Sequence, residues 1–99
     1  MKRRIAYSPE AVDHLRRLSS RQRALVLDAV DRQLAYEPTV ETRNRKLMQP
    51  NLLAVWELRV RNLRVYYDVE NDPDGIVVVQ AVGVKLRSAV RIGGEEVAL

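Results

Sequence analysis

The clearest pattern in the chain is an alternation of apolar and polar residues over positions 56–69, interrupted by the polar pair Arg61-Asn62. A period of two is typical of a β-strand with one buried face, and a polar pair between two such runs predicts a β-hairpin. With Arg61-Asn62 as its turn, the hairpin has one apolar face and one basic face. The predicted cross-strand pairs are Val60 with Leu63, Arg59 with Arg64, Leu58 with Val65, Glu57 with Tyr66, and Trp56 with Tyr67.

The pair Arg59 and Arg64 places two positive charges opposite each other on the basic face. Like charges in this position destabilise a sheet. The arrangement makes sense if an anion such as a phosphate binds above both guanidinium groups. The alternative is a solvated surface on which the two arginines pair with acidic side chains. The candidate acids are Glu57, Asp68, Glu95 and Glu96.

A short strand and two helices are predicted before the hairpin. Residues 3–7 suit the strand, Ser8-Pro9-Glu10 supplies a helix N-cap with a proline after it, and Ser19-Ser20 offers a second cap. The second helix ends before Pro38, because a residue that precedes proline avoids the helical region. The positions expected to face the core are Val12, Leu15 and Leu18, followed by Ala24, Leu27, Val30 and Leu34. His14 is expected to face solvent and Trp56 to anchor the core.

The remaining segments differ in how clearly they can be assigned. Residues 37–54 have no clear periodicity and predict a long loop, whose cluster Arg43-Asn44-Arg45-Lys46 is either plain surface or a contact site. Residues 71–75 predict a turn, and the continuous β-branched run at 76–84 predicts a central strand. Residues 85–92 fit either a helical turn or an extended segment.

The order β-α-α-β-β-β predicts one α+β domain over residues 1–99. An antiparallel sheet of about four strands would carry the N-terminal helical hairpin on one face. The basic face of the hairpin would then point away from the helices. Only the C-terminal residues could cover it, so a semi-open basic groove is expected there.

Composition narrows the possible chemistry. The chain has no cysteine and one histidine, which excludes disulfides, thiolate zinc sites and His-rich metal sites. The 17 basic and 13 acidic residues give a net charge of +4, which permits a polyanionic partner. No apolar run is long enough to span a membrane, and the basic N-terminus is not followed by a signal-peptide core. We therefore expect a cytoplasmic protein without a metal or other cofactor.

The element order, the Lys46-Leu47 pair and the run at 59–67 resemble the RelE/ParE superfamily of type II toxins. In that family the run typically reads Arg, apolar, Gly, Asp or Asn, Tyr, Arg, apolar, apolar, Tyr. Here Arg61 replaces the glycine and Leu63 the first tyrosine. The later run at 82–88 is similar to the family's valine-glycine pair followed by basic residues. The resemblance covers nearly the whole chain and implies a RelE-like fold.

The resemblance implies a toxin that cuts mRNA on the ribosome without a metal. The residues it implies for catalysis are Arg64, Lys85, Arg59 and Arg87. Those expected to bind RNA or the ribosome are Arg43, Arg45, Lys46, Arg61, Tyr66 and Arg91. Arg91 stands where many RelE-like nucleases have a tyrosine or histidine, and Tyr66 is the candidate to replace it, as a stacking or an acid group.

Two other functions stay open, because one fold can serve several activities. ParE-like members of the family inhibit DNA gyrase, and a weakly active or inactive toxin-fold protein would act by binding an antitoxin and regulating their operon. In each case the expected partner is a cognate antitoxin that covers the arginine face with an acidic-hydrophobic segment in a hetero-oligomer. The nuclease hypothesis adds the ribosome and mRNA as partners. None of the three hypotheses includes a membrane.

Overall fold

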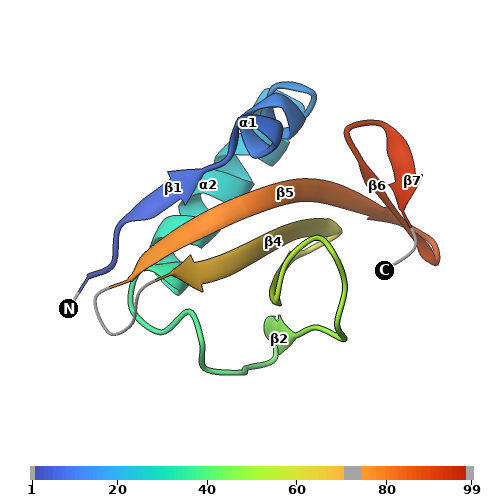
Figure 1. Ribbon diagram of the computed structural model, residues 1–99. Helices are drawn as coiled ribbons and strands as arrows, with labels where there is room; N and C mark the ends of the chain where they lie inside the picture. Colours follow the sequence, from blue (N-terminus) through green and yellow to red (C-terminus); the bar gives the residue numbers. More distant parts are fainter. Residues whose placement is uncertain (1, 71–74, 98–99) are drawn as a thin grey trace.

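The structure is a computed structural model that describes residues 2–70 and 75–97. Most of the turn predicted at 71–75 lies outside these residues. The described elements follow the expected order, with one additional strand before the hairpin and two after the central strand (Figure 1). They are β1 (Ile5–Tyr7), α1 (Pro9–Arg16), α2 (Ser20–Leu34), β2 (Arg45–Leu47), β3 (Trp56–Val60), β4 (Leu63–Glu70), β5 (Ile76–Leu86), β6 (Ala89–Ile92) and β7 (Glu95–Val97).

Both helices begin at the predicted serines. The Ser8 side chain accepts a hydrogen bond from the Ala11 N–H, and Pro9 occupies the first turn of α1. Ser19 and Gln22 form a reciprocal capping box at the start of α2, so two main-chain N–H groups that the helix itself cannot satisfy are bonded. Short polar signals along the chain therefore fix where each helix begins.

The sheet has the strand order β2-β3-β4-β5-β6-β7, and β1 pairs with β5 as a seventh strand in the described residues. It is larger than the four strands expected, because β2 forms within the segment 37–54 and β6 and β7 form after β5. One edge of β5 is shared, with β1 parallel to Val77–Val79 and β6 antiparallel to residues 83–86. The long run at 76–86 is thus a central strand, as predicted.

The central hairpin has the predicted pairing throughout. Trp56 lies opposite Tyr67, Arg59 opposite Arg64, and Val60 opposite Leu63. Trp56 also stacks on Tyr67, with ring centroids 6.3 Å apart, and packs against the core as expected. The turn residue Arg61 has φ of 56°, the left-handed conformation that the family's glycine would adopt without strain.

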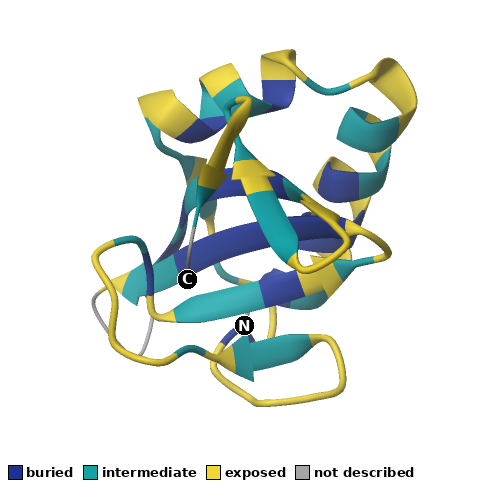
Figure 2. Cartoon of the chain, turned by 90° about the vertical axis from the view of Figure 1, so that its right-hand side faces the viewer, coloured by how far each residue is buried: buried dark blue, intermediate teal, exposed yellow. Residues whose placement is uncertain are grey.

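A β-bulge explains how β5 buries so many residues against the helices. Tyr66 lies opposite Ala81 but Tyr67 lies opposite Val79, which leaves Gln80 as the extra residue. The bulge shifts the alternation by one position. As a result Val77 and Val79 before it and Val82 and Val84 after it all belong to the helix-side core. Figure 2 shows buried residues along the central strands and on the helix surfaces that face them.

The second face of the sheet is covered by more than the C-terminal residues. A smaller core forms there around Ala54, Tyr66 and Ala81. The segment before β3 contributes Met48 and Leu53, and β6 contributes Val90 and Ile92. The segment 37–54 is also not wholly irregular, because it contains β2. The groove expected on this face is therefore smaller than the sequence suggested.

Two expectations about the helices were wrong. Ala24 and Leu27 are exposed, and α2 instead buries Val26, Ala29, Val30 and Leu34, because the sheet meets α2 on a face slightly rotated from the predicted one. His14 is only partly exposed to solvent. Its Nδ1 accepts a hydrogen bond of 3.2 Å from the Val82 N–H, because β5 passes beside α1 at that point.

Candidate functional site

The basic face of the hairpin contains a pocket of about 370 Å³. We call it the arginine pocket. Its walls come from β3, β4, the end of β5 and the C-terminal strands, so it forms only when distant parts of the chain meet. It is lined by Glu57, Arg59, Arg64, Tyr66, Lys85, Ser88, Val90 and Val97.

Arg59 is held by a neighbouring carboxylate. Its Nε lies 2.8 Å from Glu57 Oε1, in an ion pair along β3. The Arg59 side chain is 47% exposed, whereas that of Glu57 is 13% exposed. The predicted pairing of an arginine with an acidic side chain is thus confirmed for Arg59 and Glu57. Because the Arg59 side chain is still partly exposed, it can also contact a molecule in the pocket.

Arg64 is more deeply placed, with 8% of the residue exposed. Its Nη1 donates to the main-chain oxygen atoms of Arg61 and Leu63 at 2.8 and 2.9 Å. The expected pairing with Asp68 is not formed, because Asp68 instead accepts bonds from the Val55 N–H and the Gln80 side chain. Within the described residues no carboxylate neutralises Arg64, so its charge is available to an anion.

Lys85 brings a third cation to the pocket from β5. Its position is fixed by the backbone, since the Lys85 N–H donates to the Asn62 oxygen at 2.7 Å beside the hairpin turn. The exposed Lys85 side chain therefore stands at the same end of the sheet as Arg59 and Arg64. Three cationic groups share the pocket with the single carboxylate of Glu57.

Tyr66 lines the arginine pocket and is fully buried. Its ring belongs to the smaller core, so the expectation that it stacks on a nucleic-acid base does not agree with its position. Burial raises the pKa of its hydroxyl, and the Glu57 carboxylate raises it further, while Arg64 and Arg59 lower it. Although Glu57 is close enough to act in this way, the Tyr66 hydroxyl makes no hydrogen bond of normal geometry.

Six predicted site residues lie outside the pocket lining, and three of these are in turns or on β6. Arg87 is exposed in the β5–β6 turn, with φ of 59°, and Arg61 is exposed in the hairpin turn. Arg91 lies opposite Val84, whose side chain packs on the helix-side core. Since directly paired residues share a face, Arg91 points to the opposite side of the sheet from Arg64. It therefore does not take the place of the family's C-terminal tyrosine in this pocket.

The basic residues before the hairpin have different environments. Arg43 is exposed, whereas Arg45 donates to the main-chain oxygen atoms of Val40 and Gln33 at 3.0 and 2.7 Å. Arg45 thereby ties this segment to the end of α2. Lys46 lies directly opposite Glu57 in the sheet, and so it flanks the arginine pocket on the same face.

Four residues that line the pocket were not predicted from the sequence, namely Glu57, Ser88, Val90 and Val97. The alternating pattern already placed Glu57 on the face of Arg59 and Tyr66, which was a usable signal. Ser88, Val90 and Val97 had no such signal, because their positions depend on how β6 and β7 pair with the rest of the sheet.

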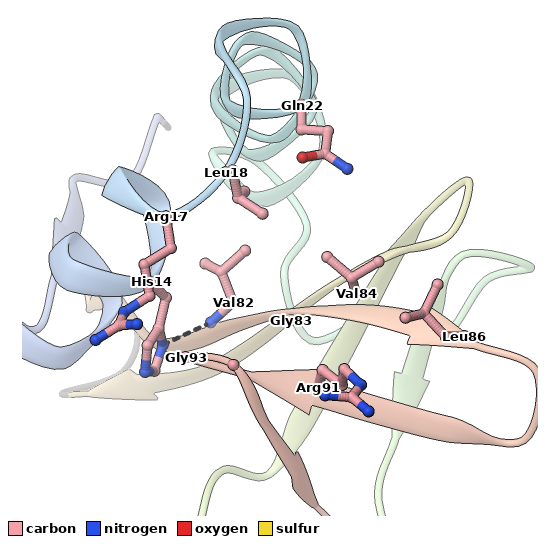
Figure 3. Close-up of a pocket in the computed structure, with 11 residues that line it drawn as sticks. His14, Arg17, Leu18, Gln22, Val82, Gly83, Val84, Leu86, Arg91 and Gly93 are labelled. Carbon is pink, nitrogen blue, oxygen red and sulfur yellow. Dashed lines mark hydrogen bonds between the residues drawn. The ribbon is translucent and has the colours of Figure 1, made fainter.

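A second pocket, of about 290 Å³, lies on the helix side of the same end of the sheet (Figure 3). Its polar lining includes His14, Arg17, Gln22 and Arg91. Burial lowers the pKa of His14, Asp13 opposes this effect, and Arg17 adds to it. The neutral ring is the form that can accept the Val82 N–H at Nδ1.

The described residues contain no cluster of His, Cys, Asp and Glu side chains suited to a metal ion. None of the helices in residues 2–70 and 75–97 is long and apolar enough to cross a membrane.

No protein-family model and no curated protein matches the sequence. The fold, however, is similar to that of a chain in the crystal structure of the toxin–antitoxin complex RelBE2 from Mycobacterium tuberculosis. The two chains align with a TM-score of 0.72 and 22% sequence identity, over 86% of this chain and 100% of the other. This likeness, together with two helices packed on one face of a largely antiparallel sheet, shows that the chain has the RelE-like α+β fold.

Proposed function

We propose that this chain is the toxin of a type II toxin–antitoxin pair and that it cuts mRNA on the ribosome. The observation that carries the proposal is the arginine pocket, which gathers Arg59, Arg64 and Lys85 around the Glu57 carboxylate on a RelE-like fold. The likeness to a chain of a toxin–antitoxin complex supports a toxin with an antitoxin partner. The resemblance of the run at 59–67 to RelE-like toxins supports RNA as the target.

The pocket has the groups that RNA cleavage by the neighbouring 2′-hydroxyl needs. A base must take the 2′ proton, cations must stabilise the charge that develops on phosphorus, and an acid must protonate the leaving 5′-oxygen. Glu57 is the base, because a carboxylate accepts protons and a guanidinium does not. Arg59 holds Glu57 in place at 2.8 Å.

The remaining roles follow from charge and position. Arg64 and Arg59 bind the phosphate oxygens, and Lys85 gives its proton to the leaving group. The 2′-oxygen forms a bond to phosphorus as the bond from phosphorus to the 5′-oxygen breaks. The products are a 2′,3′-cyclic phosphate and a 5′-hydroxyl, with one proton gained by Glu57 and one lost by Lys85. This arrangement assigns no catalytic part to Arg87 or Arg91.

Arg43, Lys46, Arg61 and Arg87 are proposed to contact RNA or ribosome phosphates around the pocket. Arg43, Arg61 and Arg87 are exposed, and Lys46 flanks the pocket beside Glu57. Contacts of this kind give affinity without sequence preference and weaken as salt is raised. Arg45 is better explained as a structural residue, because its guanidinium is bonded to Val40 and Gln33.

A purified translation system tests the proposal. Added protein should cut mRNA when ribosomes are present and leave it intact when they are absent. Glu57→Gln protein of equal concentration should cut far more slowly. Intact mRNA together with relaxed plasmid in a DNA gyrase supercoiling assay would contradict the proposal and favour gyrase inhibition. Intact mRNA with normal supercoiling would favour a protein that acts only through its antitoxin.

A further inference from the structure

The Tyr66 hydroxyl is a buried donor that is close to the Glu57 carboxylate but forms no hydrogen bond of normal geometry with it. Tyr66 has 0% of its surface exposed, and its Oη is among the buried side-chain atoms that form no hydrogen bond in the described residues. A buried polar group in this state destabilises the folded protein. A phenylalanine at this position would fill the same space and avoid the cost. The hydroxyl therefore needs an explanation other than packing.

The Tyr66 side chain borders both the smaller core and the arginine pocket. The ring packs among Ala54, Ala81 and other apolar residues of the smaller core. Tyr66 lies opposite Glu57 in the sheet, and it lines the arginine pocket together with Glu57, Arg59 and Arg64. Tyr66 thus borders the same pocket as the two arginines that the proposed function assigns to phosphate.

The neighbouring carboxylate does not satisfy the hydroxyl. Glu57 Oε1 accepts a bond from Arg59 at 2.8 Å, and no bond of normal geometry joins Glu57 to Tyr66. Tyr66 and the two arginines are therefore three donors that converge on one space. A tetrahedral oxyanion offers several acceptor oxygens at once and matches such a set.

We infer that Tyr66 Oη donates a hydrogen bond to a phosphate group bound between Arg59 and Arg64, so that the tyrosine is part of the substrate-binding site. This inference deepens the proposed function, on which it relies for the identity of the phosphate as part of RNA. The role differs from base stacking, because the ring is buried in the smaller core and has no free face.

The neighbouring Tyr67 provides a matched control. It is also fully buried, but its hydroxyl lies on the helix side and donates to the Pro38 main-chain oxygen at 2.5 Å. Tyr67→Phe should lower the thermal unfolding temperature, because it leaves Pro38 without this partner. Tyr66→Phe removes a hydroxyl that has no partner, so the unfolding temperature should stay the same or rise.

The test is a titration of the whole chain with inorganic phosphate, followed by NMR of the tyrosine Cζ and arginine Nε signals. Tyr66→Phe should weaken phosphate binding about tenfold, which is the loss expected for one hydrogen bond to a charged group. Tyr67→Phe should bind phosphate as the wild type does. In the wild type, phosphate should shift the Tyr66 Cζ signal, which tests the contact without any substitution.

Equal phosphate affinity in the wild type and Tyr66→Phe would overturn the inference. So would a Tyr66 Cζ signal that phosphate does not move, or a wild-type chain that shows no saturable binding. The translation assay separates this result from the proposed function. Phosphate binding through Tyr66 without mRNA cleavage rejects only the nuclease proposal, whereas ribosome-dependent cleavage that Tyr66→Phe leaves unchanged rejects only the Tyr66 contact.

Discussion

The guanidinium group of Arg64 donates from Nη1 to the main-chain oxygen of Arg61, 2.8 Å away, and so bonds the hairpin turn from within the pocket. The same atom also donates to the Leu63 oxygen at 2.9 Å. Arg64 is therefore a structural residue as well as a candidate phosphate ligand, and the two roles can be separated by substitution.

Arg64→Ala should relieve growth arrest in cells and also lower the free energy of unfolding by about 1–3 kcal/mol, because one buried and one partly buried carbonyl group lose a charged donor. Urea denaturation measures the stability change. The matched variant Arg64→Lys keeps the charge but lacks the planar fork of arginine. Growth arrest that persists with Arg64→Ala, at the same level of folded protein, would contradict a catalytic role.

Glu57→Gln should reduce ribosome-dependent cleavage by about 10²–10⁴-fold, the usual contribution of a general base. The amide keeps the size of the side chain and an oxygen that Arg59 can donate to, so the fold should be retained. Glu70→Gln is the control, since Glu70 is an exposed carboxylate of β4 outside the pocket. Equal losses of cleavage in Glu57→Gln and Glu70→Gln would indicate an effect of net charge and would contradict the role of Glu57 as a general base.

Arg61→Gly should raise the free energy of unfolding by up to about 1 kcal/mol, because glycine adopts a φ of 56° without the strain that arginine has there. Thermal unfolding measures the change. Asn62→Gly is the control, because Asn62 is not among the described residues with positive φ. It should lower stability slightly, through the greater entropy of the unfolded chain. A destabilised Arg61→Gly protein would show that the arginine side chain itself supports the turn.

Gly83→Ala should displace β6 and lower stability by about 1–3 kcal/mol. A Cβ at this position would lie 2.8 Å from the Arg91 oxygen and 2.9 Å from side-chain atoms of Val90 and Ile92. Because Val90 also lines the arginine pocket, phosphate affinity should fall as well. Gly94→Ala, which meets no atom closer than 3.9 Å, should show only the strain of its φ of 85° and leave phosphate binding unchanged.

Stability should fall with pH below about 6.5 through His14. Burial lowers the pKa of His14 in the folded chain, so between that pKa and 6.5 the unfolded chain binds more protons than the folded one. The free energy of unfolding therefore rises with pH in this window. Above the window the whole contribution of His14 to stability is present. Protonation also removes the acceptor of the Val82 N–H.

Urea denaturation of the wild type and His14→Asn at several pH values tests this point. Asparagine does not titrate, so the slope of stability between pH 5 and about 6.5 should become smaller. Acidic groups near His14, namely Asp13 and Glu10, oppose the effect, while Arg17 adds to it. An unchanged slope in His14→Asn would assign the acid sensitivity to other residues.

The sequence by itself determined the features that depend on neighbouring residues. Alternation with a period of two fixed the pairing of Arg59 with Arg64, because a shift by one residue would turn every apolar side chain to the other face. Ser8 and Ser19 fixed the helix starts, since a cap acts within a few residues. The order of elements, together with the resemblance, was enough for the RelE-like fold.

The tertiary structure alone decided which of these residues form a site. The bulge at Gln80 sets the face of each residue after it, and so brings Lys85 into the arginine pocket. Pairing with Val84 turns Arg91 to the other side of the sheet. Tyr66 is buried because residues 48–54 and β6 close over it. These contacts join residues far apart in the chain, and a local periodic pattern carries no information about which distant segment covers a face.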